Sequence, residues 1–212
     1  MEKIISILFL VVFCSLGVKA QKFKYFHSHF VMKEKNTFDS TTTLVLGKVT
    51  YDKNEDKIIF DLNFPEIQKW VFQDTTLYKY GNDSILKEVV VGKFGELSIF
   101  KEILEVKDND FGLKKVGFVI DKVEQAGKET IVYWKPPTQM ATFLKSATTV
   151  VEDNLLRSIF FTDVDDKVIN SSYFDEYKII KGLPVPCKIQ SRWKGQKQEI
   201  FKILTFDQVE IK

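Results

Sequence analysis

The side chains best suited to chemistry in this chain are two histidines and a single cysteine beyond the N-terminal region. His27 and His29 are one residue apart, so on a strand both would point to the same face. A zinc site usually needs three protein ligands, and no further His or nearby Cys supplies the third. A pair of half-exposed strand histidines is the simpler interpretation, and we expect no bound metal.

Nucleophilic catalysis would need a Ser, Cys or Thr beside a base, and a histidine base could only be His27 or His29. Cys187 follows Gly-Leu-Pro-Val-Pro and opens an apolar run, which favours a buried, unreactive thiol. The sequence has no nucleophile elbow, Walker loop, dinucleotide glycine pattern or HExxH helix. We therefore expect a protein that is not an enzyme and has no cofactor.

Two acidic clusters, at 52–56 and 163–166, lie between apolar runs. Asp and Asn side chains bond to nearby backbone groups, which makes both clusters typical of hairpin turns. A calcium-binding EF-hand loop needs a Gly at its sixth position and a Glu at its twelfth, and neither cluster has both. Turns are therefore the preferred interpretation.

The charges of the chain are nearly balanced, with 31 basic and 29 acidic residues. Lysines alternate with Glu and Asp along most segments, whereas proteins that bind nucleic acid usually concentrate basic residues on one face. This distribution predicts an ordinary solvated surface and no nucleic-acid partner.

The N-terminal residues 1–20 have the composition of a cleavable signal peptide. Lys3 supplies positive charge, 4–13 form an apolar run, and Val-Lys-Ala at 18–20 provides a small-x-small cleavage site. The run is shorter than the roughly 20 apolar residues that span a bilayer. We expect cleavage after position 20.

The alternative for this region is a lipoprotein signal in which Cys14 receives the lipid. The bulky Phe13 stands where such signals usually have Gly, Ala or Ser, which disfavours lipidation. We therefore expect an exported protein with one domain over 21–212.

Most of this domain is predicted to be antiparallel strand. β-branched and aromatic residues recur in short runs separated by Gly, Asn and Asp. From 141 onward the runs follow one another closely, as in a meander. The predicted strands are 25–33, 42–51, 58–64, 69–72, 76–80, 112–122, 130–134, 141–151, 155–162, 168–180, 187–193 and 199–211.

The segment 96–105 instead has helical periodicity. Its apolar stripe consists of Leu97, Phe100, Ile103 and Leu104. The residues expected to face solvent are Glu96, Lys101, Glu102 and Glu105. Such a helix buries its stripe against a sheet, so the fold class is α+β, mostly antiparallel β, with a curved sheet covered by one or more helices.

Two segments resemble the outer-membrane lipoprotein carrier family, also called LolA-like. They are Lys-Trp-Val-Phe-Gln-Asp-Thr-Thr-Leu-Tyr-Lys-Tyr at 69–80 and Tyr-Lys-Ile-Ile-Lys-Gly-Leu-Pro-Val-Pro-Cys-Lys-Ile at 177–189. The first resembles the family's hairpin before the helix, and the second its strand, glycine turn and returning strand. The resemblance extends over most of 40–212 and implies an incomplete β-barrel capped by helices.

The sequence also departs from the family pattern at two points. The family's N-terminal helix is poorly represented in 21–36, and its strand arginine is absent, with Lys57 only an approximate substitute. Because a shared fold does not determine function, the chain can carry a different lipid or another apolar ligand.

The resemblance implies a periplasmic carrier for lipid-modified proteins or other acyl-chain ligands. Its partners would be an inner-membrane donor and an outer-membrane acceptor, with helix 97–104 as the cap of an apolar cavity. We expect a monomer. Residues of the cavity are predicted to be Trp70, Phe72, Tyr78, Tyr80, Phe100, Leu104, Trp134 and Phe143.

The high aromatic content, 14% of the chain, is compatible with a ligand cavity or with an ordinary core. A curved sheet closed on one side by a helix can enclose unfilled volume, which acyl chains would suit. The alternative is a non-enzymatic accessory protein with a filled core that binds a protein partner.

Overall fold

The computed structural model describes residues 23–212, except for 82–83, 91–94, 106–108 and 196–197. The signal peptide expected at 1–20 and the candidate lipidation site Cys14 lie outside the described residues. Within these ranges no helix is both long and apolar enough to cross a membrane.

The described residues form one antiparallel sheet of 13 strands in the order β6-β5-β4-β3-β2-β1-β13-β12-β11-β10-β9-β8-β7. Pairing of β1 with β13 brings the first and last described strands together at the centre, and the sheet stays open at its edge strands β6 and β7. The strands are β1 Tyr25–Asn36, β2 Thr42–Asp52, β3 Lys57–Phe64, β4 Gln68–Gln73, β5 Thr76–Gly81, β6 Ser84–Val90, β7 Val119–Ala126, β8 Glu129–Lys135, β9 Leu144–Glu152, β10 Leu155–Asp163, β11 Val168–Ile180, β12 Leu183–Lys194 and β13 Glu199–Ile211.

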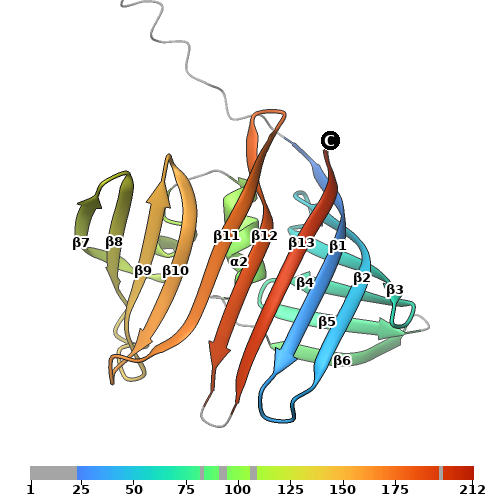
Figure 1. Cartoon of the computed structure of the whole chain (residues 1–212), viewed down its shortest axis with the longest axis horizontal. Helices are drawn as coiled ribbons and strands as arrows, with labels where there is room; N and C mark the ends of the chain where they lie inside the picture. The colour runs from blue at the N-terminus through green and yellow to red at the C-terminus, as the bar shows by residue number, and fades with distance from the viewer. Residues whose placement is uncertain (1–22, 82–83, 91–94, 106–108, 196–197) are drawn as a thin grey trace, which may run out of the picture.

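The sheet is strongly curved. In Figure 1, β4, β5 and β6 run across the direction of the central strands, and the helix α2 (Glu96–Glu105) lies behind β11 and β12. Along β1, Phe26, Ser28 and Phe30 are buried while His27 and His29 alternate with them on the other face. The fold is therefore mostly antiparallel β, as predicted, with the form of an incomplete barrel.

The helix α2 buries the predicted stripe of Leu97, Phe100, Ile103 and Leu104. The Phe100 ring meets the Phe26 ring of β1 edge-on, with centroids 5.6 Å apart. This contact places the helix against the inner face of the central strands.

The prediction that Glu96 and Lys101 face solvent is wrong, because both residues are buried. Lys202 Nζ donates a hydrogen bond of 2.6 Å to Glu96 Oε1, and Lys101 Nζ donates one of 2.9 Å to Asp56 Oδ2. The concave sheet thus covers the sides of the helix as well as its apolar stripe, and charged residues there become ion-paired.

The strand predicted at 112–122 is wrong in its first half. Residues 114–116 form a 3-10 turn, and the strand β7 begins only at Val119. Gly112 and Gly117 have φ of 81° and 94°, in the left-handed region that glycine adopts readily and that interrupts a strand. The edge strand β6 was absent from the prediction.

Two other strand boundaries shift. The strand predicted from 141 begins at Leu144, after a turn. The strand predicted from 187 begins at Leu183, despite Pro184 and Pro186. This part of β12 pairs only with β11, since pairing with β13 begins at Lys188, so proline's missing N–H is tolerated.

Both acidic clusters are turns, as predicted. Asp52 Oδ1 accepts backbone hydrogen bonds of 2.9 Å from Asn54 and 3.2 Å from Glu55. Asp163 Oδ1 accepts bonds of 2.9 Å from the backbone N–H groups of Asp165 and Lys167. Both carboxylates therefore stabilise their hairpin turns.

Candidate functional site

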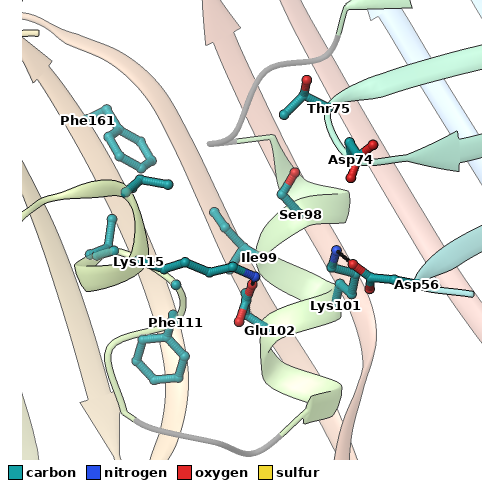
Figure 2. A pocket seen from close by; sticks show the side chains of 13 residues that line it. Asp56, Asp74, Thr75, Ser98, Ile99, Lys101, Glu102, Phe111, Lys115 and Phe161 are labelled. Atoms are coloured by element: carbon teal, nitrogen blue, oxygen red, sulfur yellow. Dashed lines mark hydrogen bonds and ion pairs between the residues drawn. The ribbon is translucent and has the colours of Figure 1, made fainter. Parts of the chain in front are cut away.

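A groove of about 300 Å³ lies beside α2, and Figure 2 shows the side chains around it. The turns before β3 and β5 contribute Asp56, Asp74 and Thr75, and the segment after the helix faces them. The volume is at the lower end of the range for small-molecule sites, about 300–1,000 Å³. The complete lining consists of Asp56, Asp74, Thr75, Ser98, Ile99, Lys101, Glu102, Phe111, Gly112, Leu113, Lys115, Val116 and Phe161.

The apolar part of this groove is formed by three elements. Ile99 of α2, Leu113 of the following segment and Phe161 of β10 are all buried, and Phe111 lies beside them. The rest of the lining is polar and includes Asp56, Asp74, Lys101, Glu102 and Lys115. The groove therefore combines an apolar floor with charged walls.

Two ion pairs attach α2 to the opposite sides of the groove (Figure 2). Lys101 Nζ lies 2.9 Å from Asp56 Oδ2 in the turn before β3. Lys115 Nζ lies 3.3 Å from Glu102 Oε1, with the lysine largely exposed. Surface pairs of the second kind contribute little, about 0–1 kcal/mol, whereas Lys101 is buried and would be left without its direct partner if Asp56 were replaced.

The C-terminal end of α2 is held by a neutral donor. The hydroxyl of Tyr51 donates a hydrogen bond of 2.8 Å to Glu105 Oε1 and lies 3.3 Å from Asp56 Oδ1. Burial, and then the hydrogen bond and charge of Glu105, raise the pKa of Tyr51 far above its usual value. Tyr51 therefore remains protonated and able to donate.

The N-terminal end of α2 is held by a charged pair. Lys202 Nζ lies 2.6 Å from Glu96 Oε1 and 3.7 Å from Glu34 Oε2. Burial opposes ionisation of Glu96, but the charge and hydrogen bond of Lys202 outweigh it, so the pKa of Glu96 is lowered. Both ends of the helix thus have specific polar contacts with the sheet.

None of the predicted cavity residues lines the groove, although four of them belong to the same hydrophobic core and Trp70 packs against it. Phe72, Phe100, Leu104 and Trp134 are buried, with Phe100 and Leu104 on α2. Trp134 lies in β8, in the other half of the sheet from Phe72.

The predicted aromatic residues of the β4–β5 hairpin lie on opposite faces of the sheet. Register pairs Trp70 with Lys79 and Phe72 with Leu77, whereas Tyr78 pairs with Val71 and Tyr80 with Lys69. Since paired residues share a face, Tyr78 and Tyr80 point away from Trp70 and Phe72. Phe143 is 55% exposed in the turn before β9. Ligand contact by any of the eight residues remains a prediction.

The groove residues that sequence reasoning missed belong to turns and to the segment before β7. Asp74 and Thr75 form the β4–β5 turn, and Phe111 precedes Gly112. The two glycines at 112 and 117 were the available signal, because they mark a loop that can fold back on the helix.

The histidines and the cysteine lie elsewhere. His27 Nδ1 is 3.0 Å from Thr50 Oγ1 on the face opposite α2. Cys187 is buried, as predicted, and burial raises the pKa of its thiol. Among the described residues no three His, Cys, Asp or Glu side chains are grouped so as to hold a metal ion.

Comparison with known proteins gives likeness in structure only. No family model matches the chain, and no curated protein matches it in sequence. A DUF1329 family protein from Desulfovibrio piger is similar with a TM-score of 0.61 and 11% identity, over 90% of this chain and 87% of that one. A LolA superfamily protein from Nitrosomonas europaea is similar with a TM-score of 0.57 and 13% identity, over 91% and 88%.

A domain from Vibrio parahaemolyticus named for outer membrane lipoprotein sorting is similar with a TM-score of 0.60 and 10% identity, over 91% of this chain and 87% of that one. These likenesses show a shared fold. The chain has a LolA-like fold, as the sequence resemblance implied.

Proposed function

We propose that this protein is a monomeric, non-enzymatic carrier that binds acyl chains of lipids or lipid-modified proteins on the inner face of its curved sheet. The observation that carries the proposal is the position of α2. A helix of 10 residues fills part of the concavity of an unclosed sheet with apolar side chains and leaves a groove of about 300 Å³ beside it.

An acyl chain would bind to the same apolar inner face of the sheet that α2 covers. Phe100 and Leu104 of the helix are almost fully buried in the concavity. Each methylene buried there would contribute about 0.8 kcal/mol, so displacing the helix by a long chain is energetically reasonable. We therefore assign α2 as a cap that moves when the ligand enters.

The proposal also assigns the protein to a cellular compartment. The structural neighbours include a LolA superfamily protein and a domain named for outer membrane lipoprotein sorting, which supports an exported protein. With the signal peptide expected at 1–20, we place the carrier in the periplasm, between an inner-membrane donor and an outer-membrane acceptor. Release would then be driven by a recipient that holds the acyl chain more tightly.

The alternative is an accessory protein with a filled core that binds a protein partner. Such a protein needs no space beside its helix. The open volume of about 300 Å³ beside α2 supports the carrier over this alternative.

The test is to fill the groove. Val116 is half-buried in its lining, so Val116→Trp should lower the affinity for a fluorescent acyl probe by about tenfold or more, a loss of about 1.4 kcal/mol. Val164→Trp, in the exposed turn before β11, is the matched control and should bind as the wild type does. Equal binding by all three proteins would show that the groove is not part of the site.

A further inference from the structure

A row of paired residues crosses the sheet from β3 to its edge strand β6. Phe60 pairs with Trp70, Trp70 with Lys79, and Lys79 with Lys87. Paired residues lie on the same face of a sheet. Since the Phe60 ring lies against the buried Phe30 ring, with centroids 5.0 Å apart, the row lies on the inner face. It changes from apolar to cationic toward the open edge.

Lys79 is half-buried, and its Nζ lies 3.8 Å from the centroid of the Trp70 ring. Burial and then the positive charge of Lys87 lower the pKa of Lys79. Like charges directly opposite each other on a sheet destabilise it. The structure therefore places the exposed Lys87 opposite Lys79, whose charge burial already disfavours.

The neighbouring acidic residues are already paired. Glu34 and Glu96 both contact Lys202, at 3.7 Å and 2.6 Å. In the part of the chain that the structure describes, neither Lys79 nor Lys87 forms an ion pair. Lys79 and Lys87 thus carry positive charge that a bound anion would compensate.

We infer that Lys79 and Lys87 form a subsite for the anionic headgroup, a carboxylate or a phosphate, of an amphiphile whose acyl chain lies on the apolar part of the inner face. The inference rests on the proposed acyl-binding function and adds the ligand's charge to it. Trp70, between Phe60 and Lys79, would contact the chain next to the headgroup.

The experiment compares dodecanoate with its methyl ester by titration calorimetry. The wild type should prefer the anion by about tenfold or more, about 1.4 kcal/mol. The double variant Lys79→Gln/Lys87→Gln should lose this preference and keep its affinity for the ester. The matched control is Lys122→Gln/Lys135→Gln, which removes the same charge from exposed lysines of β7 and β8 and should keep the preference.

The outcomes separate the two proposals. If neither compound binds, the carrier function fails. If the wild type binds both equally, or the double variant keeps the preference, the headgroup subsite is wrong while the carrier survives. A third arm compares dodecyl phosphate with inorganic phosphate, and equally tight binding of inorganic phosphate would overturn an amphiphile as the source of the anion.

Folding of the double variant is checked by thermal melting without ligand. The substitutions relieve repulsion but also remove the contact of Lys79 Nζ with the Trp70 ring, so the variant should melt close to the temperature of the wild type. Should the double variant not fold, the exposed single variant Lys87→Gln takes its place and should show a reduced preference for dodecanoate. An unchanged preference in that variant would contradict the inference.

Discussion

The ring of Phe100 in α2 stacks on the ring of Phe206 in β13, with centroids 4.8 Å apart and an angle of 17° between the planes. β13 is a central strand, paired with β1 on one side and β12 on the other. The helix therefore contacts the middle of the concave face, where an acyl ligand would have to replace it.

This contact should be a major part of the folding energy. Phe100→Ala should lower the free energy of unfolding by about 3–5 kcal/mol, because it leaves a cavity in the buried interface. Urea denaturation measures the change. The control Phe143→Ala removes an exposed ring and should change stability by no more than about 0.5 kcal/mol. Similar losses in both variants would contradict the assigned packing.

The two substitutions that break the ion pair of Lys101 with Asp56 should lower the stability of the protein by different amounts. Asp56→Asn removes the ion-pair partner of the buried Lys101 ammonium, whereas Lys101→Met leaves a carboxylate that is about half exposed. Asp56→Asn should therefore destabilise the protein more than Lys101→Met does. For Lys101→Met we expect a loss of roughly 1.5–3 kcal/mol. Chemical denaturation of both variants decides the order, and the reverse order would contradict the burial of Lys101.

The pair of Glu96 with Lys202 predicts a loss of stability in acid. The pKa of Glu96 is lowered in the folded protein, so its contribution is present above the ordinary value of 4.5 and is lost as pH falls through the folded value. Glu96→Gln should lower the melting temperature near neutral pH. The difference from the wild type should shrink below pH 4.5, and a difference that stays constant with pH would be inconsistent with this pair.

The register of the β4–β5 hairpin predicts which aromatic residues can contact a ligand. Trp70 lies on the inner face, so Trp70→Ala should weaken binding of dodecanoate by roughly 1–3 kcal/mol, as for other buried aromatic contacts. Tyr78→Ala removes a ring from the outer face and should leave binding unchanged. Calorimetry of both variants tests this, and a larger effect at Tyr78 would place the ligand on the other face.

Periodicity was sufficient for most of the strands and for the apolar stripe of α2, but it missed the edge strand β6 and extended β7 into the loop before it. It could not show the burial of Glu96 and Lys101, because the spacing of apolar residues says nothing about how far a concave sheet reaches around the sides of a helix. Their partners, Lys202 and Asp56, are distant in sequence.

The candidate site was less predictable than the fold. Tyr78 and Tyr80 were grouped with Trp70 and Phe72 by sequence, yet pairing of Gln73 with Thr76 across a tight turn sets the opposite faces. The groove is built from Phe111 and other residues of loops, whose course depends on tertiary contacts.

The most direct test of the carrier function is native mass spectrometry of the purified protein after incubation with dodecanoate. The carrier function predicts a complex of one protein chain with bound ligand, which Val116→Trp reduces and Val164→Trp does not. The absence of any bound ligand, together with no binding of the fluorescent acyl probe, would contradict it.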